Sequence, residues 1–241
     1  MVAQRPTSQV AGVIEALTAW TAGVFAVADR LAATVTALAA GDEPLTRARL
    51  RPIGALAHEA LSRDRPLLQG AGFVAAVGEL KDARRWLEWF SSDVDGRPQR
   101  LTVQTDPQGE YFYDYTLMPW FTVPRDTGRR HVTGPYVDYL CTNDYTLTFT
   151  VPVHRGSRLV GVAGCDVAVG TAERELLPAL RSTPQRLAVV NRDGRVLASN
   201  SGRHICGDLV RSPDVAALWQ EAAHPGLHAI EDLPLGVAEL S

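Results

Sequence analysis

The stretch YTLTFTVPVHRGSRLVGVAGCDVAV, residues 145–169, decides the fold. From Tyr145 to Val151, large apolar residues alternate strictly with threonines, which is the period of a β-strand with two different faces. The triplet Arg155–Ser157 has the composition of a turn. The segment Arg158–Val169 is apolar at nearly every position, as in a strand buried on both sides. The sequence therefore predicts a central antiparallel hairpin.

Two helices are expected before this hairpin. Apolar residues recur at helical spacing between Gln9 and Ala40, which predicts one long helix. A second helix is expected from about Asp42 to Arg63, with a kink at Pro52. The apolar run Gly72–Gly78 then indicates a buried strand, whereas Trp86–Phe90 is compatible with either a strand or a helical turn.

The remaining segments indicate hairpins and short helices. Residues 106–109, Asp-Pro-Gln-Gly, predict a turn between strands at 100–105 and 111–116. After the central hairpin we expect a helix at 171–181, a hairpin at 186–199, a helix at 212–223 and one or two short terminal strands. Because consecutive strands are expected to pair as antiparallel hairpins, the predicted fold class is α+β. We expect one domain over residues 1–183 and a small, truncated αβ module over 184–241.

Composition limits the classes of partner. The chain has 241 residues, is 46% hydrophobic and carries a formal net charge of −3, so it can bury a core and lacks the basic surface of a nucleic-acid binder. Its three cysteines show no CxxC spacing, which favours reduced thiols. No cleavable leader and no uncharged apolar run of bilayer length are recognised, so the expected location is the cytoplasm, without membrane contact.

Catalytic motifs are missing from the sequence. The histidines are scattered without metal-ligand spacing, and nucleophile-elbow and phosphate-loop motifs are absent. We therefore expect no enzyme, no metal and no cofactor. A rival reading is an enzyme that uses Cys141 or Asp114 with a histidine such as His131, because a nucleophile needs a nearby base.

Asp166 is the most informative single residue. Along Val160–Val169 it is the only charge in a stretch that is otherwise apolar on both faces. A buried carboxylate without a partner costs several kcal/mol, so something must meet it. In one reading Asp166 receives a cationic group of a ligand. In the other it caps the helix near Thr171 or pairs with an arginine.

A second candidate is the aromatic run from Tyr111 to Phe121, which also contains Tyr113, Asp114, Met118 and Trp120. Such side chains would wall a pocket and attract a cation to their ring faces, or would simply fill the end of the sheet. Tyr136 follows a Gly-Pro turn, and the threonine face of residues 146–150 would either supply hydroxyls to a pocket or face water.

The order of these motifs resembles the Cache sensor domains, in particular the double-Cache type of bacterial chemoreceptors and sensor kinases. The resemblance covers about residues 9–210 and rests on Pro119–Phe121, Gly134–Asp138, the threonine-rich strand 145–153, the strand 159–167 and the segment 189–198. It implies a PAS-like antiparallel sheet with a ligand pocket between the sheet and its covering loops.

The resemblance also implies ligand-binding residues. Trp120, Tyr136 and Asp166 match positions that hold an amino-acid ligand in members of the family, and Tyr111 or Tyr113 supplies an earlier tyrosine. In those members an arginine and a tyrosine occupy the positions of Met118 and Phe121, so the carboxylate clamp is lost here. The implied ligand is an amine, a quaternary ammonium compound, or an amino acid held by another cation such as Arg125, Arg129 or Arg130.

The sequence thus predicts a free-standing sensor for an amine-containing small molecule. Without an output domain it would signal through a protein partner, and the helix from Gln9 to Ala40 would be a natural homodimerisation element. The alternative is a ligand-free interaction protein that acts as a scaffold for a transcriptional regulator or kinase.

Overall fold

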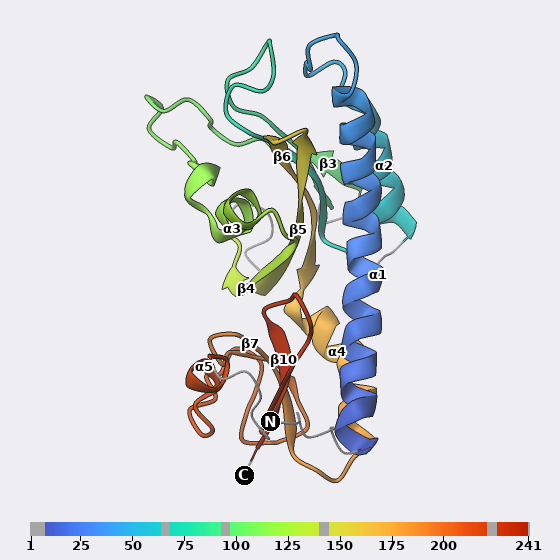
Figure 1. Ribbon diagram of the computed structural model, residues 1–241, viewed down its shortest axis with the longest axis vertical. Coiled ribbons are helices and arrows are strands. Elements are labelled where there is room, and N and C mark those ends of the chain that lie inside the picture. Colours follow the sequence, from blue (N-terminus) through green and yellow to red (C-terminus); the bar gives the residue numbers. More distant parts are fainter. Residues whose placement is uncertain (1–7, 64–67, 93–96, 140–144, 221–225, 241) are drawn as a thin grey trace. The chain divides into compact units, whose positions relative to one another are not determined.

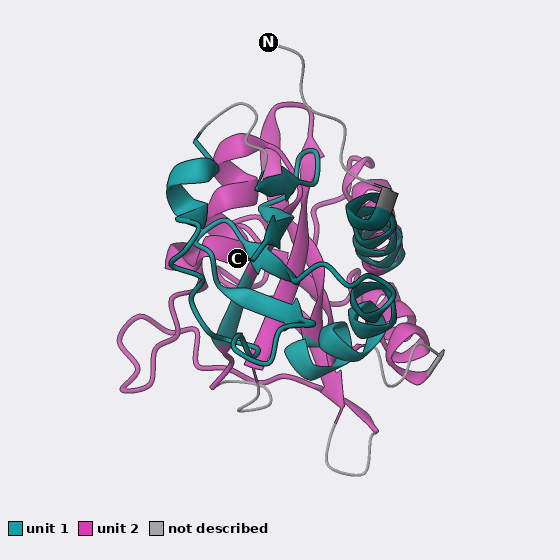
Figure 2. Cartoon of the chain, turned by 90° about the horizontal axis from the view of Figure 1, so that it is seen from below, with its two compact units in different colours: residues 1–23, 134–136, 168–241 teal, residues 24–133, 137–167 magenta. Residues whose placement is uncertain are grey.

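The computed structural model describes residues 8–63, 68–92, 97–139, 145–220 and 226–240. The chain divides into two compact units, shown in different colours in Figure 2. Unit 1 comprises residues 1–23, 134–136 and 168–241, and unit 2 comprises residues 24–133 and 137–167. The expected boundary at residue 183 stays a prediction.

Two helices precede the first sheet. The long helix α1 (Ser8–Ala39) confirms the prediction, whereas α2 (Arg51–Arg63) begins nine residues later than the expected start near Asp42. The preceding loop is fixed by tertiary contacts, because Arg47 donates its backbone N–H and its Nε to the carboxylate of Asp82 at 3.0 and 3.1 Å. Pro52 lies in the first turn of α2, where a proline interrupts no helical hydrogen bond, so the predicted kink is wrong.

A six-stranded sheet dominates the first part of the fold. Its strand order is β3-β2-β1-β6-β5-β4, and the central hairpin of β5 and β6 lies within it as predicted (Figure 1). The apolar run near residue 72 forms a strand, and the ambiguous aromatic segment forms another. The strands are β1 (Gly70–Ala75), β2 (Leu87–Ser92), β3 (Pro98–Arg100), β4 (His131–Val137), β5 (Tyr145–Arg155) and β6 (Arg158–Ala168).

The hairpin predicted around residues 106–109 is wrong. Residues 101–114 contain no strand, and the segment continues into the 3-10 helix η1 (Tyr115–Leu117) and α3 (Pro119–Thr127). Local side-chain bonds replace strand pairing, since Gln104 Oε1 accepts from the N–H of Asp106 and Asp106 Oδ1 accepts from the N–H of Gln108, both at 3.0 Å. The α+β class is nevertheless confirmed.

A four-stranded sheet in the order β8-β7-β10-β9 forms in unit 1. The predicted helix near 171–181 and the hairpin 186–199 are confirmed, but the helix expected at 212–223 is only four residues long among those described. The elements are α4 (Val169–Arg181), β7 (Leu187–Asn191), β8 (Val196–Ser199), α5 (Val215–Leu218), β9 (Leu227–Ala229) and β10 (Leu235–Glu239).

Helix α1 contains no uncharged run of 18 residues, because Glu15, Asp29 and Arg30 interrupt it, but its overall length and composition bear on membrane crossing. Over Gln9–Ala39 it is long and apolar enough to cross a membrane by length and composition, with few charges interrupting it. About a third of its most apolar window (33%) is buried inside the protein. The same length and composition occur in core helices of globular proteins and in signal sequences, so this feature alone assigns no membrane role.

The core of unit 2 includes an aromatic contact between its helical and sheet layers. Phe25 of α1 and Phe149 of β5 are almost fully buried, and their rings meet edge to face with centroids 5.1 Å apart. This geometry is favourable beyond the apolar area that it buries. The two residues therefore join the unit's part of α1 to the sheet.

We predict that Phe149→Ala lowers the free energy of unfolding by about 3–5 kcal/mol, because it removes a buried ring and leaves a cavity. Leu117→Ala, at a side chain that is 71% exposed, is the control and should change stability by no more than about 0.5 kcal/mol. Urea unfolding followed by circular dichroism measures both. Equal small effects would contradict the assignment of Phe149 to the core.

Candidate functional site

The candidate site centres on Asp166, near the end of β6. Its side chain is only 5% exposed. Its Oδ1 accepts a hydrogen bond from Thr148 Oγ1 at 2.7 Å, and its Oδ2 accepts one from the indole Nε1 of Trp89 at 3.1 Å. Both donors are neutral, and no lysine or arginine in the described part of the chain forms an ion pair with this carboxylate.

The pKa of Asp166 is raised to about 7, chiefly because the carboxyl is buried and also because the negative charge of Asp138 is nearby, while the hydrogen bonds from Thr148 and Trp89 act to lower it. Asp138 is itself buried. The site is therefore an enclosed acidic environment in which no lysine or arginine of the described ranges pairs with the carboxylate. A cation placed here would favour the ionised carboxylate and lower its pKa.

Three neighbouring strands, β1, β2 and β6, pack closely around this carboxylate. Gly70 of β1 pairs with Asp166 on one side and with Ser91 of β2 on the other. A Cβ atom at Gly70 would lie 2.6 Å from Asp166 Oδ2 and 2.8 Å from Trp89 Nε1, both closer than non-bonded atoms tolerate. The absence of a side chain at Gly70 is thus what allows the indole and the carboxylate to meet.

The aromatic run forms a packed cluster. The rings of Tyr115 and Phe121 meet with centroids 5.3 Å apart, and Trp120 stacks on Tyr115 with a centroid distance of 6.5 Å. The hydroxyl of Tyr115 donates to the carbonyl of Ala75 at 2.8 Å, and Thr150 Oγ1 donates to the carbonyl of Trp120 at 2.9 Å. These two bonds attach η1 and α3 to β1 and β5.

The other predicted site residues differ in their exposure and in their local structural role. Tyr111 is 79% exposed, while Tyr113 is half-buried. Asp114 caps η1, since its Oδ1 accepts from the N–H of Thr116, and Met118 occupies the N-cap position of α3. Tyr136 is half-buried in β4. The roles of these residues in ligand binding stay predictions.

Two of the cations considered for a ligand carboxylate are engaged elsewhere. Arg125 pairs with its neighbour Asp126 at 2.7 Å on an exposed surface. Arg130 pairs with Asp29 at 3.3 Å and stacks over the ring of Phe25 at 4.6 Å from its centroid. Neither guanidinium contacts Asp166 or its hydrogen-bond donors within the described residues.

Sequence reasoning missed Trp89, Gly70 and the electrostatic influence of Asp138. The contact between Trp89 and Asp166 joins residues 77 positions apart, and it depends on the register of three strands. Cys141 lies outside the described residues, so the rival nucleophile has no structural description. Burial lowers the pKa of His131, its proposed base.

The comparisons with known proteins agree with this architecture. Residues 95–173 match the family model of the first PDC sensor domain of methyl-accepting chemotaxis protein-like proteins. The extracellular domain described as that of a histidine kinase, soHK1S-Z6, is similar with a TM-score of 0.64 and 15% identity, covering 97% of this chain and 91% of that one. No curated protein sequence matches.

Two ligand-binding domains of chemoreceptors, both in complex with L-valine, have the same fold. That of Campylobacter jejuni Tlp3 has a TM-score of 0.62 and 11% identity, covering 96% of this chain and 88% of that one. That of Pseudomonas fluorescens CtaA has a TM-score of 0.57 and 14% identity, covering 95% and 91%.

The fold is therefore that of the sensory ligand-binding domains of receptors. More narrowly, residues 95–173 match a PDC sensor domain of the methyl-accepting chemotaxis protein-like type, and with the shared fold this confirms the resemblance to Cache domains predicted from the sequence. The predicted cytoplasmic location is wrong, because domains of this kind stand outside the cell, as the histidine-kinase domain does.

We predict that Asp166 makes stability depend on pH. Its folded pKa, about 7, lies above the ordinary value of 3.8, so between these values the folded chain holds a proton that the unfolded chain has lost. The free energy of unfolding, measured relative to Asp166→Asn, should fall as the pH rises from about 4 to about 7 and then level off. Parallel denaturation series for the two proteins measure this difference. A difference independent of pH would contradict the buried, unpaired state of Asp166.

We also predict that Gly70→Ala destabilises the fold and separates Trp89 from Asp166, because the new Cβ overlaps both partners. Gly12→Ala is the control, since nothing lies within 4 Å of a Cβ there and Gly12 is inside α1. It should stabilise the helix by about 0.5–1 kcal/mol. Thermal unfolding and tryptophan fluorescence compare the variants, and similar behaviour of both would contradict the close approach at Gly70.

Proposed function

We propose that this chain is an extracytoplasmic sensory domain that binds a small molecule carrying a positively charged amino group, with Asp166 as the residue that receives it. The observation that carries the proposal is a buried carboxylate whose hydrogen-bond donors, Thr148 and Trp89, are both neutral. A buried structural carboxylate is commonly neutralised by a lysine or arginine, whereas a buried carboxylate with only neutral donors leaves this role to a ligand.

The aromatic surroundings support a cationic ligand. Trp89 is buried beside the carboxylate, and Trp120 is buried where α3 is bonded to β5. Indole faces attract cations, and an ammonium enclosed with them gains about 2 kcal/mol or more when desolvated. The unpaired negative charge therefore favours an amine or a quaternary ammonium group over a neutral ligand, and a buried indole face would add to this attraction where the ligand reaches one.

The proposed signalling role is supported by the fold class rather than by the site. The similar domains belong to chemoreceptors and a histidine kinase, and two of them are bound to L-valine. We infer that ligand binding here changes the interaction of the domain with a signalling partner. Helix α1 (Ser8–Ala39) would provide the contact between two copies of the chain. This role needs no catalysis.

The test is calorimetric titration with a panel of primary amines, betaines, polyamines and amino acids at pH 8. A ligand at about 100 times its dissociation constant should stabilise the fold by about 2.7 kcal/mol. We predict that Asp166→Asn abolishes this binding, while Asp126→Asn, which removes the same charge from an exposed pair, leaves it unchanged. Affinity for the amine should rise as the pH increases through about 7, because the carboxylate then ionises.

Three results would overturn the proposal. Binding that survives in Asp166→Asn would remove the assigned residue, and binding confined to carboxylates would move the site to an arginine. If no compound in the panel binds, the ligand-free scaffold becomes the better account of the chain.

A further inference from the structure

A buried asparagine of the four-stranded sheet holds the strand that leads to the candidate site. Asn191, the last residue of β7, is buried, and its Nδ2 donates to the carbonyl of Gly134 at 2.9 Å. Gly134–Tyr136 is the part of β4 that belongs to unit 1, as β7 does, whereas the residues of β4 on either side belong to unit 2. The side chain of Asn191 therefore fixes β4 at the point where the chain passes between the units.

The other atom of the Asn191 amide is bonded within its own hairpin. Its Oδ1 accepts from the backbone N–H groups of Asp193 at 3.0 Å and Arg195 at 2.8 Å, in the connection between β7 and β8. Because two N–H donors face this atom, it is the amide oxygen, and the nitrogen is directed at Gly134. One side chain thus joins the β7–β8 turn to β4.

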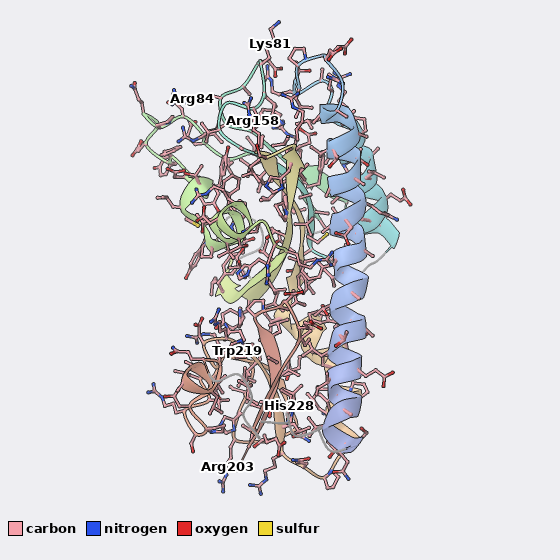
Figure 3. All side chains as sticks on the ribbon, viewed as in Figure 1. Lys81, Arg84, Arg158, Arg203, Trp219 and His228 are labelled. Carbon is pink, nitrogen blue, oxygen red and sulfur yellow. The ribbon has the colours of Figure 1, made fainter. Side chains whose placement is uncertain are left out.

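Two other polar side chains of the same sheet bond to different partners. Asn200 donates from its Nδ2 to the carbonyls of Leu180 and Gln185 at 2.7 and 2.8 Å. His228, which Figure 3 labels in unit 1, pairs with Glu239 at 2.9 Å. These partners all lie in the chain from α4 onward. Asn200 therefore offers a control that resembles Asn191 in chemistry but does not bond β4.

The segment that is held at Gly134 continues directly to Asp138, four residues later, which is about 13 Å of extended chain. Val137 is 37% exposed and Tyr139 is 80% exposed, whereas Asp138 between them is only 7% exposed, so Asp138 faces inward. Its negative charge raises the pKa of Asp166. Gly134 has a φ of +116°, a conformation that favours glycine, so this point of β4 is intrinsically flexible and needs a partner to fix it.

We propose that Asn191 is a positioning residue for the candidate site, because its bond to Gly134 keeps the carboxylate of Asp138 close to Asp166. This inference rests on the proposed function, in which Asp166 receives the positive charge of the ligand. Two carboxylates attract a cation more strongly than one, so a displaced Asp138 weakens the binding of an amine. The four-stranded sheet thereby contributes to ligand affinity through β4.

The first measurement needs no ligand. Asn191→Asp keeps the oxygen that accepts from the β7–β8 turn and removes the donor to Gly134, while Asn200→Asp is the matched control that adds the same charge to the same sheet. In each background, the free energy of unfolding is compared with and without Asp166→Asn across the pH range. Taking the difference within one background cancels the general effect of the substitution on stability.

We predict that the contribution of Asp166 levels off at a lower pH in Asn191→Asp than in the wild-type protein, because Asp138 then raises the pKa of Asp166 less. Asn200→Asp should leave this pH unchanged. The negative charge that Asn191→Asp adds would by itself raise the pKa of Asp166 and shift the transition the opposite way, so the sign of the shift separates lost positioning from added charge.

The second measurement is calorimetric titration with butylamine at pH 8. Asn191→Asp should weaken its binding by about two- to tenfold, which is the range that one hydrogen bond contributes, and Asn200→Asp should not. In the Asp138→Asn background, Asn191→Asp should cause no further loss, because the residue through which it acts is already changed. If Asn191→Asp does not fold, Asn191→Ser replaces it, since a serine hydroxyl still accepts from a turn N–H.

The proposal is overturned if the Asp166 transition stays at the same pH or moves to a higher one in Asn191→Asp. It is also overturned if butylamine binds equally well to Asn191→Asp and to the wild-type protein. If neither butylamine nor any other amine binds the wild-type protein, the proposed function fails, and the ligand-free measurement alone then decides whether Asn191 positions Asp138.

Discussion

The contact of Trp89 and Thr148 with the carboxylate of Asp166 is the constraint on which the site depends. It joins β2, β5 and β6 at one point of the sheet, and β1 passes between them. Only a residue without a Cβ fits in β1 at this point, which explains Gly70. The buried carboxylate of Asp166 therefore constrains the residue types at the facing positions of β1, β2 and β5. It also concentrates negative charge at a place where no lysine or arginine of the described residues neutralises it.

The sequence predicted the features that depend on neighbouring residues, and it missed the contacts between residues that are far apart in the chain. The threonine alternation in β5, the apolar character of β6 and the isolated charge of Asp166 are visible in one stretch of chain, so the hairpin and the central residue of the site followed from them. Trp89 could not be found in this way. Its partner is 77 residues distant, and only the register of β1 against both β2 and β6 brings the indole to the carboxylate.

The mistaken hairpin near residue 106 has a related cause. The turn signal Asp-Pro-Gln-Gly is present, and Asp106 forms the expected local bonds, but the flanking residues lack partners in strand geometry. The backbone of Tyr113 bonds that of Gln104 at a single point, and Tyr115 is instead drawn into the core by its hydroxyl bond to Ala75. Burying the large ring of Tyr115 therefore stabilises the observed conformation more than the weak strand propensity of residues 111–116 would stabilise a hairpin.

The charges around α3 bear on which cationic ligand the site would select. A free amino acid needs a cation for its carboxylate as well as an anion for its ammonium. Met118 and Phe121 supply no charge, Arg125 is paired with Asp126, and Arg130 is held by Asp29 on α1. Adding a ligand carboxylate near Asp166 and Asp138 would then place three acids together, which is electrostatically unfavourable in a buried site. Within the function proposed above, the engagement of Arg125 and Arg130 elsewhere would favour an amine without a carboxylate, whereas two chemoreceptor domains of the same fold are bound to L-valine.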